Sequence, residues 1–237
     1  MQTKSLLAFF TYAVGVLIGL TLIGIATWGD YESTSYGFAR RSSEQLRGVS
    51  CPILLTRHET GTISLKVSNP TDRLMHPSVR TEISPEDELY IVTESVTLAP
   101  GESKRLEWAV GPENIDLGNF ILASVQVYGT YPIPSRESTC GIFIVDLPGR
   151  GRDILIALSL FGMIALGGGL YLMNKSGFRT DRPAIPWNGI LFLAVVIVCG
   201  CILSFTGAWL IAVVFLVVAL LTSLPILNSV LSAAGRK

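Results

Sequence analysis

The sequence predicts a mixed membrane protein with four transmembrane α-helices and an all-β sandwich inserted between the first and second helix. Composition and the spacing of apolar residues support this prediction. The chain has 237 residues, of which 49% are hydrophobic and 15% charged, and its mean hydropathy is +0.51. An ordinary soluble domain has about 25% charged residues. The apolar residues form four long uncharged runs, and a polar insert of roughly 120 residues follows the first run.

The first apolar run extends from Leu6 to Thr27 without a charged side chain. At 1.5 Å per residue, its roughly 22 residues reach about 33 Å as a helix, which is enough to cross a bilayer. Lipid cannot hydrogen-bond a backbone, so a run of this kind is expected to be helical. Residues 1–28 are therefore predicted to hold the first transmembrane helix.

A cleaved signal peptide is the alternative for this first segment, because Lys4 precedes a long apolar core. That core is about twice as long as the apolar region of a typical signal peptide. The residues around Ala26 also lack a convincing A-x-A cleavage site. We therefore expect an uncleaved signal anchor; cleavage would leave three helices.

The other three apolar runs are predicted to be helices as well. They extend from Ile154 to Met173, from Gly189 to Phe205 and from Ala208 to Leu227. Pro225 is expected to end or kink the last helix. The resulting boundaries are a sandwich domain at 29–152, helices at 153–174, 188–206 and 208–227, a cytoplasmic loop at 175–187 and a cytoplasmic tail at 228–237.

Basic residues flank the predicted helices mainly on one side. The loop at 175–187 has three basic residues against one acidic residue, and basic residues also precede the first helix and end the chain. Positive flanks stay on the cytoplasmic side, so we expect both termini inside, the insert outside, and the chain in the plasma membrane. Two arginines before the second helix oppose this assignment, although a long translocated domain is less bound by the rule. The residues concerned are Lys4, Arg150, Arg152, Lys175, Arg179, Asp181, Arg182, Arg236 and Lys237.

Small residues recur at helical spacing in three of the predicted helices. Such residues let helix backbones approach closely in lipid, so they predict helix packing. Packing among the chain's own helices is favoured over packing against a partner. None of the four apolar runs has an ionisable acid or base, which argues against a transport core formed by this chain alone. The packing residues are Gly15, Gly19, Gly162, Ala165, Gly169, Ala208, Ala212, Ala219 and Ser223.

The insert has the pattern of an all-β domain. Ile63, Leu65 and Val67 alternate with polar residues, as in a strand with one buried face, and a turn begins at Asn69. About seven such strands separated by turns predict a two-sheet sandwich. The other candidate strands are Cys51 to Thr56, Val79 to Ile83, Lys104 to Val110, Phe120 to Tyr128 and Cys140 to Leu147. The segment Leu89 to Leu98 is expected to form two strands or one strand with a bend.

The four cysteines divide between the two parts of the chain. Cys51 and Cys140 lie in the insert, at the start of its predicted first and last strands, where an oxidising exterior favours a disulfide. Two buried free thiols are the alternative. Cys199 and Cys201 lie in the third apolar run and are expected to be small packing residues, since a lone pair without His or acidic neighbours is a poor metal site.

Two segments of the insert resemble bacterial extracellular Ig-like or fibronectin-III-like modules. The first is Val67-Ser-Asn-Pro-Thr71, and the second is Val96-Thr-Leu-Ala-Pro-Gly-Glu-Ser103 leading into Leu106-Glu-Trp108. The resemblance covers about half of the chain and implies an Ig-like fold for the sandwich. It also implies a module that binds other proteins, glycans or neighbouring modules, and it supplies no catalytic residues.

Reactive side chains form no recognised motif. His58 and His76 are too few for a histidine-based zinc site. A triad of Ser68, His58 and Asp72 has no accompanying nucleophile elbow. The acidic run at 85–88 is expected to be a solvated turn rather than a calcium site. We therefore predict no cofactor and no metal, and the balanced charge makes nucleic acid an unlikely partner.

The sequence leaves three functions open. The first is a non-enzymatic accessory or scaffold protein whose sandwich binds other proteins in a membrane complex, so that its partners are the lipid bilayer and membrane proteins. The second is a receptor-like module for a glycan or peptide, with Tyr128, Tyr131 and Trp108 as contacts, although Trp108 is expected in the core. The third and least favoured is an enzyme at the membrane interface.

Overall fold

The structure is a computed structural model that describes residues 3–38, 42, 44–85, 90–129, 134–176 and 187–234. The chain divides into two compact units. One unit comprises Met1–Thr27 with Asp153–Lys237, and the other comprises Trp28–Arg152. The first is helical and the second contains all the described strands. Each unit is described by itself below.

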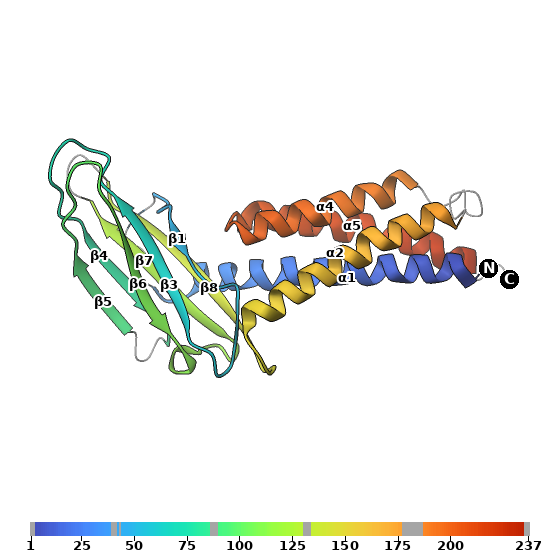
Figure 1. Cartoon of the computed structure of the whole chain (residues 1–237), viewed down its shortest axis with the longest axis horizontal. Coiled ribbons are helices and arrows are strands. Elements are labelled where there is room, and N and C mark those ends of the chain that lie inside the picture. Colours follow the sequence, from blue (N-terminus) through green and yellow to red (C-terminus); the bar gives the residue numbers. More distant parts are fainter. Residues whose placement is uncertain are drawn as a thin grey trace. The chain divides into compact units, whose positions relative to one another are not determined.

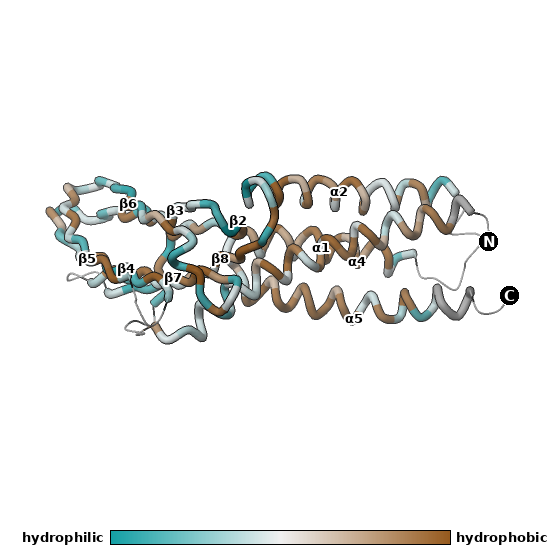
Figure 2. Tube along the Cα trace, turned by 90° about the horizontal axis from the view of Figure 1, so that it is seen from below, coloured by the Kyte–Doolittle hydropathy of each residue, from teal (hydrophilic) through white to brown (hydrophobic). Residues whose placement is uncertain are grey.

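Four long helices dominate the helical unit (Figure 1). They are α1 (Thr3–Ser35), α2 (Gly151–Lys175), α4 (Trp187–Phe205) and α5 (Trp209–Ala234). Each contains a segment long and apolar enough to cross a membrane. The hydrophobic colouring follows all four helices in Figure 2. The expected mixed architecture of four long apolar helices and two β-sheets is thus confirmed.

Two helices continue beyond their predicted ends. The first was expected to end at 28, but α1 continues to Ser35. The predicted sandwich domain at 29–152 nevertheless agrees to within one residue with the second compact unit, Trp28–Arg152. The extension of α1 lies close to a residue distant in sequence: a Cβ added to Gly29 would lie 2.8 Å from the carbonyl oxygen of Gly141. Pro225 was expected to end or kink the last helix. It does not end the helix, because α5 runs through it to Ala234 and takes up most of the predicted tail at 228–237.

Several boundary predictions lie outside the described residues. These are most of the predicted loop at 175–187, and the basic or acidic residues Arg179, Asp181, Arg182, Arg236 and Lys237. Lys175 is the last residue of α2. The tight turn between the last two helices is described, and Gly207 occupies it with φ +78°. That backbone conformation strongly favours glycine.

The second unit has two sheets. The five-stranded sheet has the order β2-β8-β7-β4-β5, and the three-stranded sheet has the order β1-β3-β6. Neighbouring strands run antiparallel, except that β2 and β8 are parallel. The strands are β1 (Val49–Ser50), β2 (Leu54–Thr56), β3 (Gly61–Ser68), β4 (Ser78–Ile83), β5 (Tyr90–Ser95), β6 (Ser103–Val110), β7 (Phe120–Tyr128) and β8 (Arg136–Val145).

The two cysteines of the insert do not begin strands as predicted. Cys51 lies between β1 and β2, and Cys140 lies in the middle of β8. The prediction failed because the residues before Cys140 are polar, whereas an apolar alternation begins only after it. Of the segment Leu89 to Leu98, expected as two strands or one with a bend, Tyr90–Ser95 forms β5, and Leu89 lies outside the described residues. Leu98 instead forms an isolated bridge with Met75.

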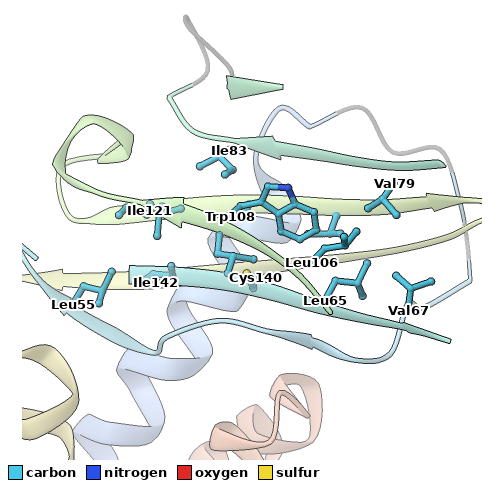
Figure 3. Close-up of a cluster of buried hydrophobic side chains, with 14 of the residues drawn as sticks. Leu55, Leu65, Val67, Val79, Ile83, Leu106, Trp108, Ile121, Cys140 and Ile142 are labelled. Atoms are coloured by element: carbon cyan, nitrogen blue, oxygen red, sulfur yellow. The ribbon is translucent and has the colours of Figure 1, made fainter. Parts of the chain in front are cut away.

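Inward-facing side chains of both sheets form one apolar core, drawn in Figure 3. In β3 and β6 the apolar residues alternate with exposed polar ones, which is the pattern of strands with one buried face. Trp108 is 5% exposed, so the expectation that it belongs to the core is confirmed. The largest buried core residues are Ile63, Leu65, Ile83, Leu98, Trp108, Ile121 and Ile142.

Candidate interaction surfaces

The two sequence segments that carry the Ig-like resemblance meet at one buried asparagine. Asn69 follows the last residue of β3 and is 1% exposed. Its side-chain Nδ2 donates hydrogen bonds to the carbonyl oxygens of Arg73, Leu98 and Ala99 at 2.7, 3.1 and 3.1 Å. Its Oδ1 accepts from the backbone nitrogen and hydroxyl of Thr71 at 3.0 and 2.6 Å. One side chain therefore ties the turn after β3 to the turn before β6.

Backbone groups strengthen the same junction. The Asn69 N–H donates to the carbonyl oxygen of Glu102 at 2.9 Å, and the Gly101 N–H donates to the carbonyl oxygen of Asn69 at 3.0 Å. The Glu102 carboxylate accepts from the Ala99 N–H at 2.7 Å. Gly101 has φ +71°, which explains why glycine follows proline in this turn.

Replacing this asparagine is a test of the junction. We expect Asn69→Ala to lower the free energy of unfolding by about 1–3 kcal/mol, because buried carbonyl groups lose their donor. The measurement is denaturant unfolding of the full chain in detergent, followed by tryptophan fluorescence. The neighbouring exposed Ser68 provides the control, and Ser68→Ala should stay within about 0.5 kcal/mol of the parent. Equal stability of the two variants would contradict the assigned role.

The insert contains one disulfide, between Cys51 and Cys140, with an S–S distance of 2.00 Å and a Cα–Cα distance of 6.5 Å. It joins the segment between β1 and β2, which belong to different sheets, to β8 of the five-stranded sheet. Cys199 and Cys201 of α4 are free thiols.

Two glycines of the helical unit lie directly against the backbone of another helix. A Cβ built on Gly15 of α1 would lie 2.8 Å from Cα of Leu166 in α2. A Cβ built on Gly169 of α2 would lie 2.6 Å from Cα of Tyr12 in α1. Real Cβ atoms do not approach backbone this closely, so even alanine would force α1 and α2 apart at both points.

The remaining predicted packing residues differ in what they meet. Gly19 faces the side chain of Ile197, and Gly162 faces the side chain of Ile18. A Cβ at these positions would lie less than 3.0 Å from the isoleucine Cγ2 atoms, and a β-branched side chain cannot easily move away. By contrast, a Cβ on Gly24, Gly167 or Gly168 would meet nothing within 4 Å. The other predicted packing residues differ in burial. Ala165, Ala212 and Ala219 are buried, whereas Ala208 and Ser223 are half-buried.

Strand β5 forms an edge of the five-stranded sheet and pairs only with β4 among the described strands. It contains neither lysine nor proline, the residues with which proteins commonly block an edge strand. Tyr90 and Ile91 are 55% and 47% exposed. An edge strand of this kind offers unpaired backbone groups and apolar side chains to an incoming strand.

A hollow of about 490 Å³ lies between β5 and β6, the edge strands of the two sheets. Its lining includes three glutamates and no basic residue. Glu94 accepts a hydrogen bond from the Trp108 indole nitrogen at 3.0 Å, and Glu107 pairs with Arg105 at 2.9 Å. The third, Glu113, has no ion pair within the described part of the chain. This edge of the sandwich is therefore acidic.

The structure assembles no catalytic group from the sequence candidates. His58 lies in the turn before β3, and Ser68 ends that strand, so the eight-residue β3 separates them. His76 is exposed, and its Nδ1 lies 3.1 Å from the hydroxyl oxygen of Thr97. Across residues 3–38, 42, 44–85, 90–129, 134–176 and 187–234, no three His, Cys, Asp or Glu side chains are grouped to hold a metal ion.

Of the two tyrosines predicted to contact a ligand, only Tyr128 lies among the described residues. Tyr128 is the last residue of β7 and is half-buried. Tyr131 and the acidic residues at 86–88 lie outside the described residues. The acidic hollow was not predicted, because Glu94, Glu107 and Glu113 belong to three separate elements and only the sheet order brings them together.

Comparison with known proteins gives distant structural likenesses alone. No family model matches the chain, and no curated protein matches it. The CARDB domain of a Pyrococcus furiosus protein, solved in solution, is 17% identical with a TM-score of 0.33, covering 41% of this chain and 91% of that one. Its crystal structure with di-metal ions is 16% identical with a TM-score of 0.34, covering 46% and 100%.

A β-glucosidase from Erythrobacter marinus is also similar, at 17% identity and a TM-score of 0.30. The likeness covers 46% of this chain and 18% of the enzyme. Likenesses at these identities and TM-scores carry no conclusion about what this chain binds or catalyses.

Proposed function

We propose that this chain is a non-enzymatic integral membrane scaffold or accessory protein whose β-sandwich docks a protein partner on the outer face of the plasma membrane. The observation that carries the proposal is the unblocked edge strand β5, with exposed Tyr90 and Ile91, beside an acidic hollow. The four apolar helices anchor the chain, with both termini in the cytoplasm.

The partner contributes an extended segment that pairs with β5 as an added strand. Backbone hydrogen bonds along the edge supply affinity, and alternate side chains enter the neighbouring hollow. The segment is basic, because the hollow presents the carboxylates of Glu94 and Glu113 without a basic residue in its lining, while Glu107 is already paired with Arg105. A second copy of β5 would bring like charges together at the same place, so a basic partner is favoured over self-association.

A crosslinking experiment tests this docking edge. The full chain is expressed with a photo-crosslinking residue at position 91 and purified in mild detergent. We expect a crosslinked membrane protein with a basic extended segment, and we expect Ile91→Lys to reduce its recovery about tenfold, since an edge lysine blocks strand addition. The control is Thr62→Lys, which adds the same charge on an exposed residue of the central strand β3.

Neutralising the hollow separates charge recognition from strand addition. Glu94→Gln with Glu113→Gln should weaken recovery and reduce its sensitivity to salt, while the glutamine at 94 still accepts the Trp108 indole hydrogen bond. Three results would overturn the proposal. These are a chain that crosslinks only to a second copy of itself, equal partner recovery from the two lysine variants, and a chain that purifies alone.

A further inference from the structure

A second hollow, on the outer face of the three-stranded sheet, is basic. It has a volume of about 340 Å³, and its lining includes Lys66, Lys104 and Arg105 but no acidic residue. The hollow belongs to β1, β3 and β6, whereas the acidic edge lies between β5 and β6. The two surfaces differ in charge and in the strands that form them.

The strand register places like charges directly opposite each other. Lys66 of β3 is the cross-strand partner of Arg105 in β6. Opposed like charges destabilise an antiparallel pair unless other groups offset them. Arg105 is partly neutralised by Glu107 at 2.9 Å, but Lys66 and Lys104 have no ion pair in the part of the chain that the structure describes. Lys66 and Arg105 share the outer face of the sheet. Lys104 is instead the partner of the core residue Val67 and projects from the opposite face, so Lys66 is the uncompensated charge beside Arg105.

Hydroxyl groups complete the lining. Ser50, Ser64 and Ser103 border the hollow, and Ser50 lies opposite Ser64 in the β1–β3 register. Arg105 donates a hydrogen bond from Nη2 to the Ser64 hydroxyl oxygen at 3.0 Å, which fixes the guanidinium along this face and leaves the Ser64 hydroxyl hydrogen available as a donor. Ammonium, guanidinium and hydroxyl donors around one hollow are the groups that bind phosphate and sulfate oxygens.

We propose that this hollow binds a phosphate or sulfate group through Lys66, Arg105 and the neighbouring serine hydroxyls. The anion offsets the repulsion that the register builds into β3 and β6. The same chemistry occurs on a lipid headgroup and on a soluble phosphorylated or sulfated sugar. The site does not depend on the docking edge, so either proposal can fail without the other.

Binding is measured on the full chain in nanodiscs of zwitterionic lipid. The probes are inorganic phosphate, a sulfated oligosaccharide and vesicles that contain phosphatidylglycerol. We expect saturable binding of one of these probes, weakened about tenfold or more by Lys66→Gln with Arg105→Gln. Binding of phosphate or the oligosaccharide identifies a soluble ligand, whereas binding of the vesicles alone identifies a lipid headgroup.

A charge-matched control separates a site from general attraction. Arg57→Gln with Arg73→Gln removes the same two charges from exposed positions elsewhere on the sandwich. These variants should retain binding within about twofold, because long-range attraction is screened at physiological salt. Equal losses in the two double variants, or no saturable binding of any probe, would overturn the proposal. Lys66→Gln alone replaces an exposed side chain and keeps the test open if the double variant unfolds.

Discussion

Alanine at Gly15 or Gly169 is expected to destabilise the helical unit, although alanine is the better helix former. The added methyl group would press on the backbone of the facing helix, at 2.8 Å from Leu166 Cα in one case and 2.6 Å from Tyr12 Cα in the other. Overpacking of this kind costs about 1–3 kcal/mol. The measurement is thermal unfolding of the full chain in one detergent, where both variants should unfold at lower temperature than the parent.

Gly168→Ala is the matched control, because it lies beside Gly169 in α2 and its Cβ would meet nothing within 4 Å. This variant should be as stable as the parent or more stable, since alanine gains up to about 1 kcal/mol of helix propensity over glycine. Opposite shifts at neighbouring positions would identify contact between α1 and α2 as the cause. If instead Gly15→Ala leaves stability unchanged but abolishes recovery of a partner, the small residues face that partner.

Removing the Cys51–Cys140 disulfide is expected to produce a loss of similar or greater size. The bond closes a loop with a sequence separation of 89 residues. Loop-closure entropy for this length is roughly 4–5 kcal/mol, and measured values are more often about 2–4 kcal/mol. We expect Cys51→Ser with Cys140→Ser to lower the free energy of unfolding by about 2–4 kcal/mol, as measured by denaturant unfolding followed by intrinsic tryptophan fluorescence.

Cys199→Ala is the control for this experiment, since Cys199 is a free thiol in α4. The redox state of the four cysteines also reports the orientation of the chain. If the insert faces the oxidising exterior, thiol labelling of denatured protein from intact cells should modify Cys199 and Cys201 but not Cys51 and Cys140. Modification of all four cysteines would place the insert on the reducing side and contradict the proposed topology.

The sequence was informative wherever local pattern decides structure. Uncharged runs predict apolar helices because lipid imposes length and composition, and the alternation at Ile63, Leu65 and Val67 predicts β3 because a pleated strand has one buried face. The end of α1 was not predictable in this way. Residues 28–35 lack an apolar period, and Gly29 lies against the backbone of Gly141, more than 100 positions away in the chain.

The candidate surfaces were hidden for the same reason. Glu94 and Glu113 are unremarkable in sequence, and they share a hollow only because β5 and β6 are edge strands of sheets that pack together. Lys66 and Arg105 become neighbours only through the register of β3 with β6. Strand order and register are set by packing over the whole domain, so surfaces that depend on them are visible only in the fold.

The approach of Gly29 to Gly141 has a consequence for sequence change. A Cβ on either residue would collide with the other's backbone, so neither position can accept a side chain while the helix end stays seated on β8. The two positions are thus coupled. Replacing one glycine would force this turn of α1 away from β8. Once the two backbones were apart, the second position could also accept a side chain.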